Sequence, residues 1–209
     1  MAHADYVVLP AGDTYARAGD RICTAFFPDS GVLSSISQMA TGHQVTIALI
    51  GAEGLLGFEP LLGITHYPQR LAALMTCEGY RVHVDHLRQA FQQSRTLRAV
   101  ALAHVGRMMS EVATVAACGR VHAHRQRLAR WILVATDKAQ QASLPVTHDA
   151  LAQMVGGPRH AVTVALNQLR ARGALAHRRG RIDVLDRSVL IAHACECYPG
   201  GTLFPQANR

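Results

Sequence analysis

The sequence predicts an α+β protein with three successive parts: a β-rich N-terminal domain, one long helix, and a winged helix-turn-helix. Short apolar runs alternate with turn residues through the first ninety positions, an apolar stripe at helical spacing follows Arg95, and two short helices around a glycine turn follow Thr147. We expect these parts at residues 1–93, 94–118 and 119–192, followed by a C-terminal tail at 193–209.

The N-terminal part is expected to be a small barrel or sandwich. Gly, Asp, Pro and Ser cluster between its apolar runs, a spacing typical of strands joined by tight turns. Residues 51–59 interrupt the series with three glycines and two acidic residues. This segment is either a ligand-binding cassette that leads into a short helix at 60–62, or simply a turn of the barrel. The expected strands are 6–9, 14–16, 22–27, 31–38, 43–50, 70–76 and 79–84.

The long helix carries a mostly apolar row at intervals of three or four residues, typical of a helix that packs along a partner helix. The row therefore predicts a dimer interface. Packing of the same row on the chain's own β-domain is the alternative, and both can hold at once. The row consists of Leu97, Ala101, His104, Met108, Val112 and Val115.

A further helix over 121–138 is expected to open the C-terminal domain, after a hinge at Gly119. Its periodicity places Leu128, Trp131, Ile132 and Ala135 inside, and Arg125, Arg127 and Arg130 outside.

The segment 147–173, THDALAQMVGGPRHAVTVALNQLRARG, has the pattern of a helix-turn-helix. Thr147 is a good N-cap for a first helix over 148–154, and Gly156 supplies the positive φ that the turn needs. Pro158 suits the first position of a second helix over 158–172, where its missing N–H costs nothing. A helical hairpin that merely packs is the alternative.

The outer face of that second helix is polar. Its side chains can hydrogen-bond base edges and phosphates from a helix laid in a major groove, which predicts double-stranded DNA as the partner. Two-fold symmetry in the protein would then match a palindromic site, which favours the dimer. The face carries Arg159, His160, Thr163, Asn167 and Arg170.

Two strand-like runs, 174–176 and 182–185, flank a basic tip that contains Arg178 and Arg179, as in the wing of a winged helix. Lys and Arg number 13 against 5 Asp and Glu over residues 119–209, but 5 against 8 over 1–93. The net charge of +7 is therefore C-terminal, which favours a polyanion bound there over a membrane.

Compartment and redox state follow from two further observations. No apolar run approaches the roughly 20 residues needed to span a bilayer, and no secretory signal is recognisable. The five cysteines are odd in number and irregularly spaced, which favours reduced thiols in a cytoplasm over a disulfide framework.

His193, Cys195 and Cys197 group metal-ligand types within five residues. A zinc site or a redox pair is one interpretation, and a mobile tail is the other, which the following Tyr-Pro-Gly-Gly run favours. His122 and His124, two apart on a helix, point away from each other and are poor joint ligands. We therefore assign no metal ligand from the sequence.

The order of these parts resembles the Crp/Fnr superfamily of bacterial transcription regulators. Three segments carry the resemblance: LPAGDTYARAGDRICTAFFPDSGVLSSI, similar to the family's β-roll opening; RQRLARWIL, similar to the start of its DNA-binding domain; and LAQMVGGPRHAVTVALNQLRARGAL with RRGRIDVLDRSVL, similar to its helix-turn-helix and wing. The resemblance implies a cyclic-nucleotide-binding-like jelly roll that senses a signal, a dimerisation helix, and RNA polymerase as a further partner.

The same resemblance implies specific site residues. The DNA-binding set is Thr147, Arg159, His160, Thr163, Asn167, Arg170, Arg178 and Arg179, and the effector-binding set is Gly57, Glu59 and Arg70. Where cyclic-nucleotide binders have Gly-Glu and Arg-Ser or Arg-Thr, this chain has Gly57-Phe58 and Arg70-Leu71, so cyclic AMP is not the expected effector. In the recognition helix, His160 and Val164 replace the usual Glu and Arg, so an altered base preference is expected.

An iron–sulfur cluster of the Fnr type is not expected either, because no cysteine precedes the β-roll. An enzyme resembling a cupin is an alternative function, but His3, His43, His66 and His83 stand isolated, whereas such a site needs converging ligands. An RNA-binding module is another alternative, which one Trp and few aromatic residues disfavour.

Overall fold

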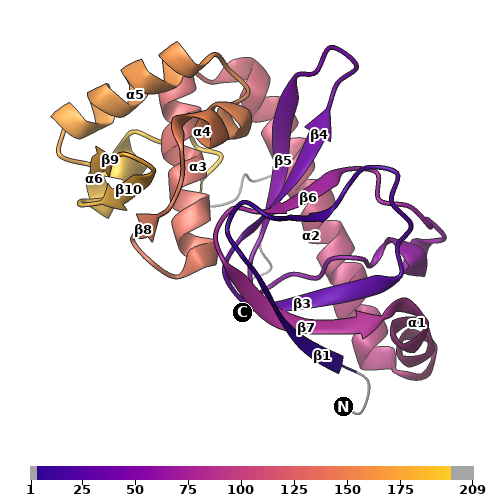
Figure 1. Ribbon diagram of the computed structural model, residues 1–209. Coiled ribbons are helices and arrows are strands. Elements are labelled where there is room, and N and C mark those ends of the chain that lie inside the picture. The colour runs from indigo at the N-terminus through magenta and orange to yellow at the C-terminus, as the bar shows by residue number, and fades with distance from the viewer. Residues whose placement is uncertain (1–3, 199–209) are drawn as a thin grey trace.

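The computed structural model describes residues 4–198 and shows a β-roll, a long helix and a winged helix-turn-helix domain in chain order (Figure 1). The α+β architecture predicted from the sequence is confirmed. The elements of the β-roll and long helix are β1 (Ala4–Leu9), β2 (Thr14–Ala16), β3 (Thr24–Ser30), β4 (Leu33–Gln38), β5 (Gln44–Ile50), the 3₁₀ helix η1 (Glu59–Leu62), β6 (Arg70–Ala73), β7 (Cys77–His83), α1 (Val84–Gln93) and α2 (Arg95–Val121). Those of the C-terminal domain are α3 (His124–Ala139), β8 (Ser143–Leu144), α4 (His148–Val155), α5 (Arg159–Ala171), β9 (Leu175–Arg178), β10 (Arg181–Val184) and α6 (Arg187–Ala192).

Two antiparallel sheets build the β-roll, with strand orders β1-β7-β3 and β2-β6-β4-β5. Phe26 and Leu33 are fully buried between them. The backbone of Phe26 also exchanges two hydrogen bonds of 3.0 Å with that of Leu56, so the 51–59 segment is attached to β3. Burial of apolar side chains such as these is the dominant favourable contribution to folding.

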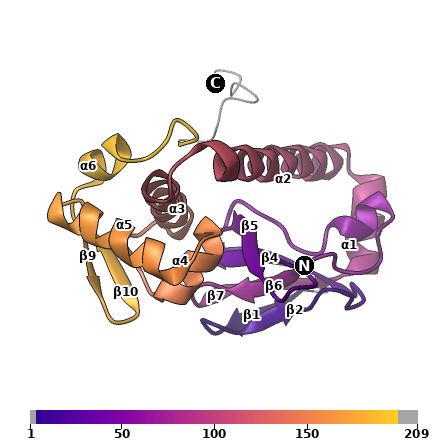
Figure 2. The same ribbon diagram turned by 90° about the horizontal axis from the view of Figure 1, so that it is seen from above.

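The long helix α2 contains 27 residues, which corresponds to roughly 40 Å at 1.5 Å per residue. It lies along the β-roll, between α1 at one end and the C-terminal domain at the other (Figure 2). The predicted hinge at Gly119 is wrong, because α2 continues through that residue and the chain becomes extended only at His122 and Ala123. A single glycine inside a helix costs only about 1 kcal/mol, and packing of the rest of α2 exceeds that cost.

The C-terminal domain has the predicted helix-turn-helix and wing. Gly156 ends α4 with φ +64°, as the turn requires. Pro158 is the N-cap of α5 with an extended ψ of 146°, rather than its first helical residue. The wing sheet has three strands in the order β8-β10-β9, and β8 escaped prediction because two residues carry no periodicity.

The C-terminal domain packs directly on the β-roll. Val32, Leu49 and Met75 of the roll share one buried cluster with Trp131 and Leu128 of α3. In Figure 1, α4 lies beside β5. This shared core fixes the orientation of the two domains.

Polar contacts join the same two domains. The Gln153 side chain of α4 donates to Oε1 of Gln44 at 3.2 Å, and Arg70 of β6 donates to that same oxygen at 3.3 Å. The Lys138 ammonium of α3 lies 2.6 Å from Oε1 of Glu53 and 3.6 Å from Oε2 of Glu111. Two separate polar links therefore connect the β-roll, through β5 and the 51–59 segment, to the helix-turn-helix domain.

Candidate nucleic-acid interface and effector pocket

Helix α5 buries one side and leaves the other open to solvent. Val162, Leu166 and Leu169 are completely buried, whereas Arg159 and His160 in the first turn are exposed. The N-terminal end of a helix is the part that enters a major groove most deeply in this motif. The exposed side of α5 therefore presents hydrogen-bonding groups where base edges would lie.

Six of the eight predicted DNA-binding residues have free, exposed side chains or only weak surface partners. Arg159 forms an exposed ion pair of 3.4 Å with Asp149, a contact that contributes little and can be exchanged for a base or phosphate. The six are Arg159, His160, Asn167, Arg170, Arg178 and Arg179.

The remaining two predicted residues have local structural roles. The Thr147 hydroxyl accepts from the Ala150 N–H at 3.1 Å and so caps α4. The Thr163 hydroxyl donates to the Arg159 carbonyl at 3.1 Å and lies 3.4 Å from Nδ1 of His148. The Thr147 hydroxyl keeps its own O–H and a second lone pair for a ligand, whereas the Thr163 O–H is already donated to the Arg159 carbonyl and only its oxygen can still accept.

Val164, which was not predicted as a DNA-binding residue, lies on the same surface of α5. Its side chain is 54% exposed on α5, three residues from Asn167 and four from His160. An exposed branched side chain at this position can contact the methyl group of a thymine.

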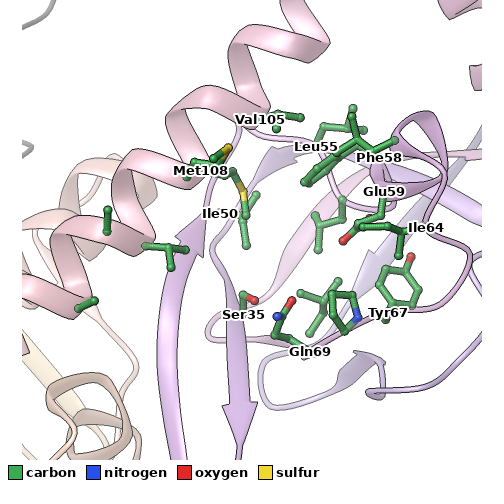
Figure 3. A pocket seen from close by; sticks show the side chains of 18 residues that line it. Ser35, Ile50, Leu55, Phe58, Glu59, Ile64, Tyr67, Gln69, Val105 and Met108 are labelled. Carbon is green, nitrogen blue, oxygen red and sulfur yellow. The ribbon is translucent and has the colours of Figure 1, made fainter. Parts of the chain in front are cut away.

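A pocket of about 520 Å³ lies between the β-roll and α2 (Figure 3). Its walls are mostly apolar, and Glu59, Gln69 and Ser35 are the polar groups that face it. None of the residues that line it is Arg, Lys or His. The full lining is Ser35, Ile50, Leu55, Leu56, Phe58, Glu59, Leu62, Ile64, Tyr67, Pro68, Gln69, Leu71, Val105, Met108, Met109, Val112, Ala113 and Ala116.

Of the three predicted effector residues, only Glu59 lines this pocket. At Gly57, φ is +72° and an added Cβ would stand 2.3 Å from the Thr24 carbonyl oxygen, so this glycine is required by the close approach of two backbones. Arg70 points instead to Gln44, at the edge facing α4. The sequence pattern could not show this, because it fixes the strand but not which side of the sheet each side chain occupies.

Burial raises the pKa of Glu59, and its Oε2 has no hydrogen-bond partner among the described residues. A carboxyl whose pKa is higher in the folded than in the unfolded protein destabilises the folded state at high pH, where it must be ionised. This destabilisation decreases as the pH falls through the folded-state pKa, and it is absent below the unfolded-state pKa. We therefore expect Glu59→Gln, which stays neutral, to raise Tm at pH 8 and to change it less at pH 5, as measured by calorimetry. A gain of about 1 kcal/mol corresponds to roughly 2–4 °C in a chain of this size.

Glu53→Gln is the matched control with the opposite sign. Burial opposes ionisation of Glu53, but the adjacent Lys138 ammonium outweighs it and lowers the pKa of Glu53. Its carboxylate then contributes stability above the unfolded pKa, and this is lost as the pH falls through the folded pKa. Glu53→Gln should lower Tm at pH 8. Equal changes in Tm for the two variants at both pH values would contradict the opposite pKa shifts assigned to Glu59 and Glu53.

His104 of α2 holds the 51–59 segment against that helix, a role that the sequence did not indicate. Burial lowers the pKa of His104, so the ring is neutral and its Nε2–H donates to the Leu55 carbonyl at 3.0 Å. Phe58 stands edge-to-face with the ring, at 5.2 Å between centroids. The pocket wall and α2 are therefore joined directly.

The predicted dimer row on α2 faces the chain's own β-roll over most of its length. Ala101 and His104 are buried inside the chain, and Leu97, Met108 and Val115 pack on its buried clusters. Only Val112, 36% exposed, remains at the edge. This row therefore packs within the chain, and its part in a dimer interface stays a prediction, because period alone does not tell which of two apolar faces meets which neighbour.

A second apolar face of α2 is open to solvent. Leu102 is 49% and Met109 69% exposed, and an added Cβ at Gly106 would meet nothing within 4 Å. These residues recur at intervals of three or four and so share one side of the helix. We call the row Leu102, Gly106, Met109, Ala113 and Ala116 the open face of α2.

Four potential metal-ligand residues meet where α2 ends. The ligand atoms of Cys118, His122, Cys195 and Cys197 all lie within 4.8 Å of one another. Among the described residues this is the only such group, so His43, His66 and His83 form no ligand cluster in the β-roll, and His3 lies outside the described residues. Cys195 and Cys197 were recognisable from their spacing, but their partners Cys118 and His122 are about 75 residues away in the chain and were not.

Both domains of the chain match family models. The cyclic nucleotide-binding domain matches residues 6–94, and the Crp-like helix-turn-helix domain matches residues 126–192. The chain belongs to the Crp/Fnr superfamily of transcription regulators. This regulator has no helix, among its described residues, that is long and apolar enough to cross a bilayer.

Solved structures share the fold of this regulator along nearly its whole length. A CRP-family transcriptional regulator from Thermus thermophilus has a TM-score of 0.77 at 20% identity, covering 90% of this chain and 96% of that one. FixK2 from Bradyrhizobium japonicum has 0.78 at 13%, covering 92% and 98%. The c-di-GMP responsive global regulator CLP of Xanthomonas campestris has 0.70 at 20%, covering 88% and 94%. No curated protein matches the chain.

Proposed function

We propose that this regulator binds a palindromic DNA site as a homodimer, reads bases with α5, and is controlled by a small molecule in the pocket between the β-roll and α2. The exposed polar side of α5 beside a basic wing is the observation that carries the proposal. RNA polymerase is a further partner that we infer from the family alone. The family models and the scattered histidines of the β-roll favour this function over an enzyme.

The open face of α2 is our candidate for the dimer interface. Gly106, Ala113 and Ala116 allow the backbones of two helices to approach closely, and Met109 and Leu102 supply apolar area to bury. Because Met109, Ala113 and Ala116 also line the pocket, a second chain on this face would close the pocket. Effector binding and dimer geometry would then affect each other.

The pocket suits a small, largely apolar molecule without negative charge. A cyclic phosphate would need a cation, and no lining residue provides one. Glu59, with its pKa raised by burial, favours a ligand group that donates a hydrogen bond or carries positive charge. Gln69 and Ser35 can orient such a group.

A comparison of duplex DNA with RNA of the same sequence tests the proposal. Genomic fragments selected by the protein should yield duplexes that it binds far more tightly than the corresponding RNA. Equal binding of both would favour the RNA-binding alternative. If the selected genomic fragments shared no sequence motif, sequence-specific contacts between α5 and the bases would be contradicted.

Arg179→Ala tests the role of the wing. Arg179 is exposed beside Gly180 at the tip between β9 and β10, so phosphates are its nearest partners on DNA. We expect the variant to weaken all duplexes alike and to reduce the slope of log affinity against log salt by about two, one for each protomer of the dimer. A loss confined to particular sequences would contradict a phosphate contact.

A further inference from the structure

The last turn of α2 and the segment after α6 come together at one buried point. Cys118 and His122 are four residues apart, so they lie on the same side of the helix end. Cys195 and Cys197 lie just beyond α6 and reach them from the other domain. Cys118 and Cys195 are buried, and the His122 side chain is only 11% exposed.

The distances fit one tetrahedral ion. Sγ of Cys118 and Sγ of Cys195 are 3.5 Å apart, and Sγ of Cys197 is 3.8 Å from Nδ1 of His122. Two sulfur ligands about 2.3 Å from one zinc ion lie roughly 3.8 Å apart, and a sulfur and a nitrogen ligand roughly 3.6 Å apart. An iron–sulfur cluster needs its ligands spread around several metal atoms, whereas these four converge on a single point.

The surroundings match those of a metal-bound histidine. With Nδ1 facing Cys197, the opposite ring atom Nε2 lies 2.9 Å from Oε1 of Glu196 and can donate to it. A carboxylate on the outer nitrogen of a ligating histidine fixes the tautomer and orientation of the ring. Glu196 itself is not part of the group of four ligands.

The charge balance also fits. Arg130 was expected on the outside of α3 but is 3% exposed, and it donates to the Cys197 carbonyl at 3.4 Å. Arg127, also expected outside, is 8% exposed and donates to the Gly119 carbonyl at 3.0 Å. Neither forms an ion pair with an acidic side chain among residues 4–198. Three thiolates and a neutral imidazole around a divalent cation have a net charge of −1, which would balance a buried guanidinium.

We propose that Cys118, His122, Cys195 and Cys197 bind one zinc ion, which fastens the C-terminal segment to the end of α2 across the extended residues 122–123. The site has three sulfurs and one nitrogen and no open position, which is typical of structural zinc. It would reinforce, at the end of α2, the orientation that the shared core gives the helix-turn-helix domain. This role is independent of the effector pocket and of base reading.

Metal analysis and cobalt substitution of the full-length protein test the proposal. Protein purified without chelator should contain about one zinc per chain, and Co²⁺ added to metal-free, reduced protein should give the thiolate charge-transfer and visible bands of a tetrahedral site. Affinity for zinc should correspond to a Kd of roughly 10⁻⁸ M or tighter. Cys118→Ser, Cys195→Ser and His122→Gln should each weaken zinc binding by at least about tenfold.

Two matched controls make the result specific. Cys23→Ser removes an exposed cysteine of the β-roll, and His193→Asn removes the histidine that the sequence grouped with Cys195 and Cys197. Both should bind one equivalent of metal as the wild type does. Loss of metal in either control to the same extent as in Cys118→Ser would overturn the assignment of the four ligands.

Three other outcomes would overturn the proposal as a whole. They are a reduced wild-type protein that contains no zinc and develops no tetrahedral cobalt bands, an octahedral cobalt spectrum, and a Cys118–Cys195 disulfide found by peptide mapping of metal-free native protein. Should the serine variants fail to fold, the wild-type cobalt spectrum and His122→Gln decide the question, because His122 lies at the end of α2 rather than within a core.

Discussion

Met109→Glu is expected to convert the proposed homodimer into monomers and to lower the affinity for the proposed palindromic operator by roughly 10²-fold or more. Met109 is the most exposed large apolar side chain on the open face of α2, so two buried carboxylates would face each other across the proposed two-fold axis. Two monomers bind the two half-sites independently. In a dimer, binding of one protomer raises the effective concentration of the other at the second half-site, and this advantage is lost. Sedimentation velocity and a gel shift measure the two effects.

Val100→Glu is the matched control. Val100 is also on α2 and 57% exposed, but it lies nine residues from Met109, on the opposite side of the helix. The variant should sediment as the wild type and bind the operator equally well. If the wild type were itself a monomer, or if both variants dissociated alike, the open face would not be the dimer interface.

Arg159→Ala is expected to remove discrimination at one symmetric base-pair position in each half-site, a loss of roughly 1–3 kcal/mol per half-site. Arg159 is exposed in the first turn of α5, and its planar fork can pair with both acceptors of a guanine edge. It needs only to leave the exposed carboxylate of Asp149. Binding to a library of operator variants, with and without the substitution, measures the change at every position.

Arg159→Lys separates base reading from charge. Lysine keeps the positive charge but lacks the fork, so a phosphate contact would survive the change and a bidentate base contact would not. We expect Arg159→Lys to show the same relaxed position as Arg159→Ala, with a smaller loss of overall affinity. If Arg159→Lys kept the base preferences of the wild type at every position, Arg159 would contact a phosphate rather than a base.

Local chemistry made most of the fold predictable. Gly156 and Thr147 indicated the turn and the cap of the helix-turn-helix, and both have those roles. Pro158 was placed one position too far into its helix, because a proline fits either an N-cap or a first turn. The short strand β8 could not be found, since its two residues are defined only by their partners in β10.

Long-range features of the sites were not accessible in this way. The row from Leu97 to Val115 has the period of a helix that packs on a neighbour, but α2 has a second apolar face with the same period. Only the position of the β-roll shows which of the two faces packs within the chain. Arg130 looked like a surface residue because its partner, the Cys197 carbonyl, is 67 residues away. Contacts across such distances depend on how the domains dock, which no local pattern encodes.

The side chains of Arg70, Gln44 and Gln153 form a continuous polar path from the sensor sheet to α4. The Arg70 and Gln153 side chains both donate to Oε1 of Gln44. A displacement of β5, which carries Gln44, relative to β6, which carries Arg70, would therefore change the contact with α4. If effector binding shifts this path and thereby multiplies the affinity for DNA, thermodynamic reciprocity requires DNA to multiply the affinity for the effector by the same factor. A cell with many operators would then bind more effector per dimer than one with few, and the regulator would report operator occupancy as well as effector concentration.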